Sequence, residues 1–418
     1  MHFLNLFHGK ETIIKMSNAN QRIEFLDGLR GWAAFVVLIG HLYPCWLYPP
    51  SDSPLSQLFY HTPLKLFTDG PSAVILFFLL SGFVLSFNFF KNYDYNALIS
   101  MAQFRYFRLL IPILCSVLIS YLFMRFNLMY TVQDHVGIFM SKPRILTALK
   151  FSFFEVFFVP DTRHLYDFGL QLWTMSREFI GSFLVFAFLS LFGTWKIRPL
   201  IYLIILPIFY KHFYYYFLFF TGLCFCDLYI LNKKYGYLLQ KYKLTLLQEN
   251  SLYAKIVEFF NIDYLFDTSL GGIFAYLYQL NLTGKISAAF PMIVLLFWAL
   301  TSDNLKSLFT SKISLFLGKI SFALYLTHLT LLCSLSHFTN ALLTSAGYPL
   351  LLRAILVSLV TLPTCLAFAY IFTLYVEDRW LKKVKSFFIN KGFIANTKNY
   401  KQLPQDSSTP LPLPAMNT

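Results

Sequence analysis

Charged residues are scarce in this chain and make up only 13% of its 418 residues. Soluble domains carry about 25% charged residues, so this composition excludes an ordinary soluble domain. In their place the chain has 57% hydrophobic and 20% aromatic residues, including 49 Phe, and its mean hydropathy is +0.57. We therefore predict an all-α fold, a polytopic bundle of helices that cross a lipid bilayer.

Cysteines are also few, and their spacing excludes two common uses. Most of the six lie in apolar runs, where Cys behaves as a small hydrophobic residue. Cys224 and Cys226 are separated by one residue, which is not the spacing of a zinc or redox pair. The sequence thus predicts no disulfide framework and no metal site. A fixed-period repeat is absent as well.

Acidic residues number 20 against 34 Lys and Arg, which gives a formal net charge of +14. In a soluble protein this excess would indicate nucleic-acid binding. Here the lysines lie in loops and tails, so the tendency of basic loops to face the cytoplasm explains them better. We predict no nucleic-acid partner.

Long apolar runs are abundant. Pro71–Phe90 and Ala354–Val376 contain no charge over 20 and 23 residues, which is enough to cross a hydrocarbon core of about 30 Å. The first span begins near Gly31. Further predicted spans are Leu109–Met124, Phe151–Pro160, Phe179–Trp195, Pro199–Tyr210, Phe213–Ile230, Ile286–Ser302 and Ile313–Ser336, about ten in all.

An even number of spans places both termini on one side of the membrane. Lys10 and Lys15 precede the first span and Lys382 and Lys383 follow the last, so we predict cytoplasmic termini. Ten spans would leave the stretch Leu231–Lys285 outside the cytoplasm. Within it, Phe259–Leu280 is apolar, but Asp263 and Asp267 make it a poor span; if it crosses, the number becomes eleven and another predicted span is wrong.

Two ionisable residues mark the first span, which reads QRIEFLDGLRGWAAFVVLIGHLYPCWLYPP over residues 21–50. Arg30 and His41 are eleven residues apart, about three helical turns, so they share one face about 16 Å apart. Arg30 marks the membrane entrance and His41 the middle of the span. An ionisable side chain at that depth indicates a functional site, although a hydrogen bond to a neighbouring helix is the alternative.

Two arginines occupy the predicted cytoplasmic mouth of the third span. Arg105 and Arg108 are three residues apart and therefore lie on one helix face. Two guanidinium groups on one face can bind phosphates through paired hydrogen bonds. A positively charged anchor at the membrane surface is the alternative.

Two further ionisable residues lie at or inside predicted spans. Glu178 is at a span edge, where a carboxylate can act as general acid or base, orient a histidine, or pair with Arg177. His328 is well inside its span, where it is either catalytic or part of an interhelical hydrogen bond.

The sequence resembles the acyltransferase-3 family of integral membrane acyltransferases. Five segments carry the resemblance, in the family's order: FLDGLRGWAAFVVLIGH (25–41), FFLLSGFVLS (77–86), FRYFRLL (104–110), LWTMSREFIGS (172–182) and LGKISFALYLTH (317–328). The first is the most specific, because it joins LDGLRG to a histidine at a fixed spacing. The likeness covers most of the chain from Arg22 to Val376.

The resemblance implies a domain of roughly ten helices that moves an acyl group from a cytoplasmic acyl-CoA, usually acetyl-CoA, to a hydroxyl of a carbohydrate or lipid. It implies that His41 and Arg30 are an essential pair and that Arg105 and Arg108 handle the donor. Glu178 matches the family's Trp-Thr/Ser…Glu segment, although Arg177 is an unusual neighbour. The membrane involved, a bacterial inner membrane or a eukaryotic endomembrane or plasma membrane, stays open.

We predict three regions: a cytoplasmic N-terminal segment (1–21), a membrane acyltransferase domain (22–376), and a basic, then Pro-rich, disordered cytoplasmic tail (377–418). In the predicted reaction His41 is a general base or an acyl carrier, and Glu178 or Asp27 orients its imidazole or takes up a proton. The competing interpretation is a proton-coupled transporter. Against it, the chain shows no two-fold repeat and no matched pair of broken helices.

Overall fold

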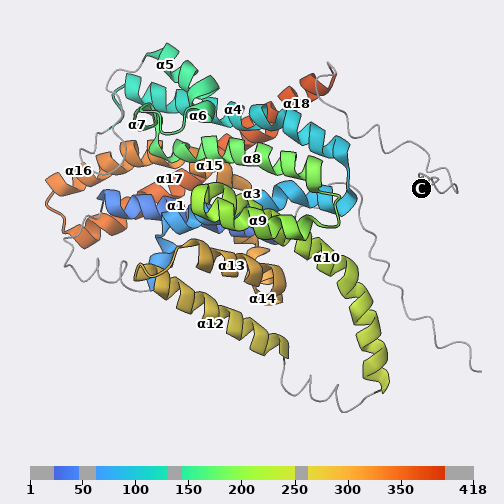
Figure 1. Cartoon of the computed structure of the whole chain (residues 1–418). Helices are drawn as coiled ribbons and strands as arrows, with labels where there is room; N and C mark the ends of the chain where they lie inside the picture. The colour runs from blue at the N-terminus through green and yellow to red at the C-terminus, as the bar shows by residue number, and fades with distance from the viewer. Residues whose placement is uncertain (1–22, 47–62, 130–143, 250–261, 391–418) are drawn as a thin grey trace, which may run out of the picture.

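The computed structural model describes residues 23–46, 63–129, 144–249 and 262–390, and the described residues contain helices and no strands (Figure 1). The elements are α1 (Glu24–Trp46), η1 (Pro63–Phe67), α3 (Gly70–Asn92), α4 (Tyr95–Arg125), α5 (Ile145–Lys150), η2 (Phe151–Glu155), α6 (Val156–Phe158), α7 (Leu165–Phe168), η3 (Leu170–Leu172), α8 (Trp173–Phe192), α9 (Arg198–His212), α10 (Tyr214–Glu249), α12 (Ile262–Leu282), α13 (Ala289–Thr301), α14 (Asp303–Phe309), α15 (Lys312–Leu331), η4 (Leu332–Ser336), α16 (His337–Ser345), α17 (Leu350–Phe372), η5 (Thr373–Trp380) and α18 (Leu381–Asn390). The predicted all-α bundle is confirmed. The predicted N-terminal segment 1–21 lies outside the described residues.

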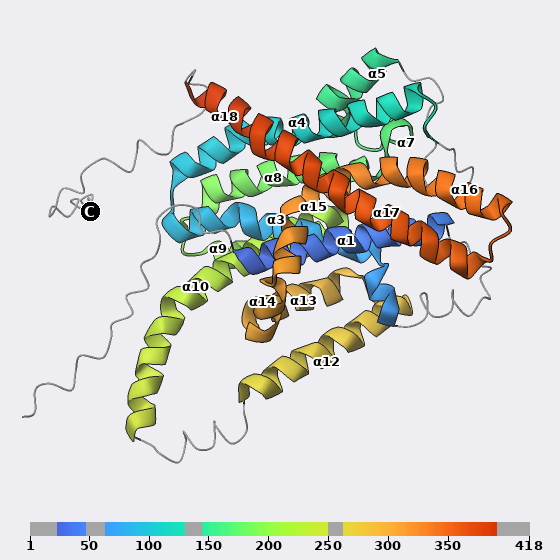
Figure 2. The same cartoon turned by 180° about the vertical axis from the view of Figure 1, so that it is seen from behind.

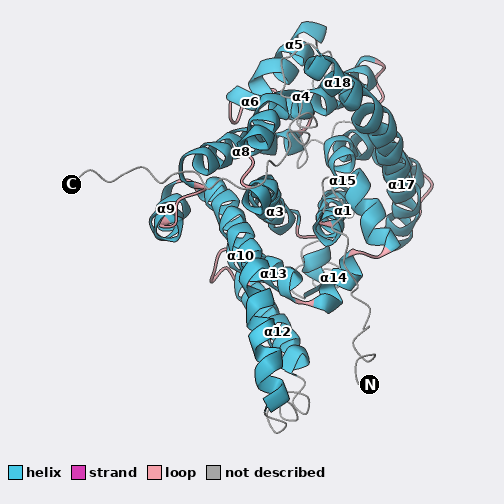
Figure 3. Ribbon diagram, turned by 90° about the vertical axis from the view of Figure 1, so that its right-hand side faces the viewer, coloured by secondary structure: helices cyan, strands magenta, loops and turns pink. Residues whose placement is uncertain are grey.

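Three helices form the centre of the bundle. Viewed along the bundle, α1, α3 and α15 lie inside a ring that includes α4, α8, α10, α13 and α17 (Figure 3). The opposite views show α8 and α9 on one face and α17 crossing α15 and α1 on the other (Figures 1 and 2). Large aromatic side chains such as Phe78, Phe83 and Phe219 are fully buried between the helices.

Glycines let two pairs of helices approach closely. A Cβ atom at Gly31 of α1 would overlap the backbone of Leu317 and Gly318 on α15. In the same way, a Cβ at Gly82 of α3 would overlap Phe219 of α10, and one at Gly222 would overlap Leu79. Small residues at helix interfaces allow this backbone contact between membrane helices. We call these two contacts the α1/α15 crossing and the α3/α10 crossing.

Seven of the described helices are long and apolar enough to cross a membrane, and the bent pair α13–α14 would make eight. This is fewer than the ten predicted. One reason is length: α9 occupies the predicted span Pro199–Tyr210 but has 15 residues, which rise only about 22 Å. In α13–α14 the helix bends by 95° after 13 residues of α13.

The predicted span Phe151–Pro160 is wrong. Its residues form the π-helical turn η2 and the short helix α6, followed by a turn. Ten residues of helix would rise about 15 Å, half of a hydrocarbon core. The segment also holds Glu155, which is 5% exposed and paired with Lys150.

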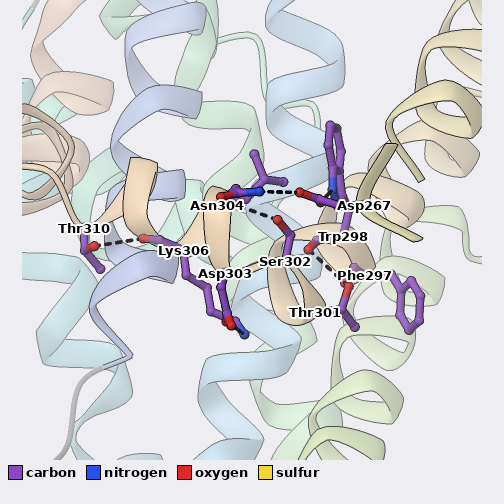
Figure 4. A network of polar contacts seen from close by, with 10 residues as sticks. Asp267, Phe297, Trp298, Thr301, Ser302, Asp303, Asn304, Lys306 and Thr310 are labelled. Atoms are coloured by element: carbon purple, nitrogen blue, oxygen red, sulfur yellow. Dashed lines mark hydrogen bonds and ion pairs between the residues drawn. The ribbon is translucent and has the colours of Figure 1, made fainter. Parts of the chain in front are cut away.

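Helix α12 contains most of the segment predicted to be a poor span. Near its start, Trp298 and Asn304, on either side of the bend between α13 and α14, both donate to the carboxylate of Asp267 (Figure 4). Near its end, Tyr278 donates to Asp69 at 3.0 Å, beside the start of α3. The helix therefore runs along the bundle between these two points, although it is not among the seven. The side chain of Asp263 is outside the described residues.

The start of α1 and the end of the last helix lie at one end of the bundle. Gly318 of α15 packs on the backbone of Asp27, and the next residue, Lys319, pairs with Asp378 of η5 at 3.8 Å. We call this the basic end, because Lys319 and Lys382 both pair with Asp378 there. Residues 377–390, which open the predicted tail, are helical, and residues 391–418 are outside the described residues.

Candidate active site

Two histidines meet where α1 and α15 pass each other. His328 Nε2 lies 3.1 Å from His41 Nδ1, and the two ring centroids are 5.1 Å apart. His328 is 1% exposed, whereas His41 is partly exposed. The close backbone contact at Gly31 and Gly318 sets the distance between the helices, and each histidine is ten residues further along its own helix. The structure thus brings together two of the predicted site residues.

The backbone carbonyls around the pair fix which nitrogen holds each proton. His328 Nδ1 lies 2.8 Å from the carbonyl oxygen of Tyr325 and 3.1 Å from that of Leu324. Carbonyl oxygens only accept, so His328 Nδ1 carries the proton and His328 Nε2 is an acceptor. His41 Nδ1 therefore donates, to His328 Nε2 and to the carbonyl of Val37 at 3.0 Å. This leaves His41 Nε2 with an unprotonated lone pair, the form that a base or nucleophile needs.

Arg30 and Asp27 pair with each other at the basic end, with Arg30 Nη1 3.2 Å from Asp27 Oδ1. Asp27 is fourteen residues from His41 on the same helix, about 21 Å along its axis. At that distance Asp27 makes no direct contact with the His41 imidazole, and a role of Asp27 or Glu178 in orienting the imidazole or taking up a proton stays a prediction. His328 and Val37 orient that imidazole.

Glu178 forms a partly buried ion pair with Arg105. One nitrogen of the Arg105 guanidinium contacts the Glu178 carboxylate and Nε donates to Ser182 Oγ at 2.8 Å. Ser182 in turn donates to the Glu178 backbone carbonyl. The alternative pairing with Arg177 is wrong, because Arg177 points the other way and binds Asp161 with two hydrogen bonds of 2.9 and 3.1 Å.

The two predicted donor-binding arginines have different surroundings. Arg105 is 8% exposed and held by Glu178 and Ser182, whereas Arg108, one turn further on α4, is exposed. The ion pair with Glu178 uses part of the Arg105 guanidinium, which has five N–H donors in total. Arg108 is therefore the more accessible of the two cations.

Polar residues that the sequence reasoning missed join η3 and the start of α8 to α15, one helical turn before His328. Tyr325, one turn before His328, donates to the carbonyl oxygen of Gln171 at 2.9 Å, and its hydroxyl lies 2.9 Å from Thr174 Oγ1. Gln171 Nε2 donates to the carbonyl of Leu326 at 2.9 Å. Both Tyr325 and Thr174 lie within the motif segments LGKISFALYLTH and LWTMSREFIGS, and these motifs could have indicated them. Neither residue is charged, so they do not stand out among the ionisable residues of the spans.

A second polar cluster joins α5, η2 and the loop before α7. His164 Nδ1 lies 2.5 Å from Glu155 Oε2, and Lys150 and Thr162 contact the same carboxylate at 3.0 Å. Burial raises the pKa of Glu155, but the hydrogen bonds from His164, Lys150 and Thr162 outweigh it and hold that pKa below its usual range. The cluster ties the irregular segment together. Among the described residues, no group of three His, Cys, Asp or Glu side chains is arranged to hold a metal ion.

Comparison with known families identifies the class of protein. A family model described as an acyltransferase domain, the acyltransferase-3 family, matches residues 23–370. The fold and the match together define a multi-pass membrane acyltransferase. The chain belongs to the acyltransferase-3 family, as its motifs predicted, and it is therefore an enzyme rather than a transporter. Neither the curated proteins nor the solved structures contain a match to it.

Proposed function

We propose that this enzyme transfers an acyl group, in particular acetyl, from cytoplasmic acyl-CoA to a hydroxyl of a carbohydrate or lipid. The observation that supports it best is the contact between His41 and His328 inside the bundle. His328 is locked as an acceptor by two backbone carbonyls, so it holds His41 in the tautomer whose Nε2 is unprotonated.

In the proposed reaction, His41 Nε2 removes the proton of the acceptor hydroxyl. The alkoxide attacks the thioester carbonyl, a C–O bond forms, the C–S bond breaks, and the CoA thiolate takes the proton from His41. While His41 is an imidazolium, its Nδ1–H stays bonded to His328 Nε2 and the Val37 carbonyl, which stabilises the positive charge. His328 is a positioning residue in this scheme.

His41 also has the geometry of an acyl carrier. In this variant of the proposal Nε2 attacks the thioester directly, the C–S bond breaks and CoA leaves as the thiolate. The acceptor hydroxyl then attacks the N-acyl imidazolium: the C–O bond forms, the C–N bond to Nε2 breaks, and the hydroxyl proton neutralises the thiolate. The same lone pair serves in both schemes. The carrier scheme applies if donor and acceptor reach His41 from opposite sides of the membrane.

The basic end of the bundle is the proposed cytoplasmic side, in agreement with its lysines. There Arg108 and the remaining donors of Arg105 would bind CoA phosphates. Glu178 holds the Arg105 guanidinium in place. Arg30, held by Asp27, lies at the same end and would add positive charge at the donor entrance.

The test combines product analysis with donor consumption. Surface glycans and lipids from cells with wild-type protein, His41→Ala or no gene are analysed by mass spectrometry, and the purified proteins in lipid nanodiscs are assayed for thiol release from acetyl-CoA and longer acyl-CoAs. We expect an acyl mass increment and thiol release with wild type and with the control variant Thr221→Val, and neither with His41→Ala nor without the gene. Thr221→Val is the matched control: it removes a hydroxyl that is bonded to its own helix, to the Phe217 carbonyl on α10.

Two outcomes would contradict the proposal. An acyl increment that survives His41→Ala would remove His41 from the chemistry while leaving the enzyme class intact. Acyl transfer from a donor other than acyl-CoA, with no thiol released, would contradict the assignment of acyl-CoA as the donor. Trapping a labelled acyl group on His41 in acid-quenched wild-type protein would select the carrier scheme over the general-base scheme.

A further inference from the structure

The C-terminal helix α18 folds against α4 beside Arg108. The rings of Phe388 on α18 and Phe107 on α4 have centroids 4.4 Å apart. One turn earlier on α18, Lys385 Nζ lies 5.7 Å from the ring of Phe104. These contacts fix α18 on the segment of α4 that contains both arginines of the predicted donor site.

α18 is the end of a helical stretch that is longer than a membrane span needs to be. Leu350–Asn390 is a continuous helical stretch of 41 residues, which rises about 60 Å, or twice the thickness of a hydrocarbon core. The last turns of this stretch include Lys382, Lys383 and Lys385, at the same end as Lys319. We infer that α18 stands in the headgroup region or in water.

Lys385 and Arg108 place two positive charges close together. Lys385 Nζ lies over the ring of Phe104, one helical turn before Arg108 on α4, and like charges at short range repel. Lys382 is compensated by Asp378 at 3.3 Å. By contrast, no carboxylate of the described residues lies within ion-pair distance of Lys385. An anion bound between Lys385 and Arg108 would relieve this repulsion.

We propose that Lys385 and Arg108 together bind the phosphate groups of the acyl-CoA donor. This inference rests on the proposed function, and it adds a residue outside the matched family region, which ends at residue 370. The two cations differ in how they bind phosphate, because a guanidinium reaches the oxygens through two parallel hydrogen bonds, whereas an ammonium acts as a compact point charge.

The position along α4 fits the shape of acyl-CoA. Ser120 of α4 contacts Thr330 of α15 at 2.7 Å, two residues after His328. Arg108 is twelve residues before Ser120, so it lies about 18 Å along the helix axis from the level of the histidines. Acyl-CoA carries its phosphates at one end and its thioester at the other, with the extended pantetheine arm between them. A donor held by Lys385 and Arg108 can therefore point its thioester at His41.

The experiment compares Lys385→Glu with Lys383→Glu, which makes the same charge change at an exposed position on the same helix. The purified proteins in nanodiscs are assayed with acetyl-CoA and with acetyl-pantetheine, which lacks the nucleotide phosphates. We expect Lys385→Glu to raise KM for acetyl-CoA about tenfold, as for the loss of one charge-assisted hydrogen bond. KM for acetyl-pantetheine, and both KM values of Lys383→Glu, should stay at the wild-type level.

A second readout, equilibrium binding of CoA to the same proteins, does not depend on turnover. Lys385-dependent CoA binding without any thiol release would keep this inference and overturn the proposed function. Equal effects of the two variants, or equal effects on the two donors, would overturn the inference. Lipid phosphates are the other source of such an anion: an effect of Lys385→Glu that is present with anionic nanodiscs and lost with phosphatidylcholine alone would assign the site to a headgroup.

Discussion

The α1/α15 and α3/α10 crossings are built alike but are filled differently. In both, glycines bring the two helix backbones into contact: Gly31 and Gly318 in the first, Gly82 and Gly222 in the second. At the α3/α10 crossing the neighbouring side chains are aromatic, with Phe78 and Phe219 rings 5.4 Å apart. Along the α1/α15 contact, ten residues beyond its glycines, the two rings that meet are instead those of His41 and His328.

This difference between the two crossings distinguishes residues needed for helix packing from residues needed for catalysis. The α3/α10 crossing demonstrates that this bundle can join a central helix to its neighbour with glycines and apolar side chains. The histidines at the α1/α15 crossing are therefore not required for close helix contact, and burying two imidazoles requires that their nitrogens find partners. A pair of polar side chains at a position where apolar side chains would suffice for helix packing indicates a functional site. Each prediction below makes one crossing resemble the other or tests a feature that the two share.

The largest effect is expected from His328→Phe, which makes the α1/α15 crossing resemble the α3/α10 crossing. The variant removes the acceptor that holds the His41 tautomer, so kcat should fall about 10²-fold or more, within the range of general-base contributions. KM for acetyl-CoA should stay unchanged, because the donor contacts are elsewhere. Steady-state kinetics with thiol detection gives both values.

His328→Gln is the conservative comparison, because its side-chain oxygen can still accept from His41 Nδ1. We expect it to recover a large part of the activity lost in His328→Phe, with a similar Tm for the two variants. Equal activity of both variants would mean that activity requires only a side chain of similar size at position 328. It would contradict the role of His328 in positioning His41.

Two ion pairs lie between other helices of the bundle, one joining α9 to α10 and one joining α4 to α8, and we expect them to differ in function. Arg198 binds Asp227 of α10 with two hydrogen bonds of 2.6 and 2.7 Å, and Arg105 binds Glu178. Removing one partner of a buried pair costs about 3–5 kcal/mol of stability. Asp227→Asn should therefore lower Tm strongly and leave kcat/KM of the folded fraction unchanged, whereas Glu178→Gln should also lower kcat/KM. Thermal unfolding and kinetics in the same nanodiscs measure both.

Gly31→Ala and Gly222→Ala test the close contacts themselves. Each new Cβ would overlap the backbone of the opposite helix, and overpacking of this kind costs about 1–3 kcal/mol. We expect similar losses of Tm but a loss of kcat only for Gly31→Ala, because widening that crossing separates His41 from His328. A matching loss of kcat in Gly222→Ala would indicate that activity follows overall stability.

The same comparison explains what the sequence could reveal. The predicted run Pro71–Phe90 is α3, and the spacing of Arg30 and His41 placed both on α1, because apolar length and helical periodicity are local properties. The contact of His41 with His328 joins residues 287 positions apart and depends on where two glycines let helices meet, which no local pattern encodes. Glu178 pairs with Arg105 rather than with its neighbour Arg177, since adjacent residues on a helix point in different directions.

The smallest effect is expected at the edge of the bundle, where α12 is attached by polar contacts rather than by a glycine crossing. Hydrogen bonds from Trp298, Asn304 and Ser302 lower the pKa of Asp267 below its ordinary value of 3.8. A carboxyl with a lowered pKa in the folded state stabilises the fold at pH values above its ordinary pKa, and this contribution disappears as the pH falls through the lowered value. Asp267→Asn should therefore reduce Tm less than Gly31→Ala at neutral pH, and the difference from wild type should shrink on acidification below about pH 4. Because Asp267 contacts α13 and α14 and neither histidine, kcat should not change. A loss of kcat in Asp267→Asn would mean that the edge of the bundle, and not only the α1/α15 crossing, controls the active site.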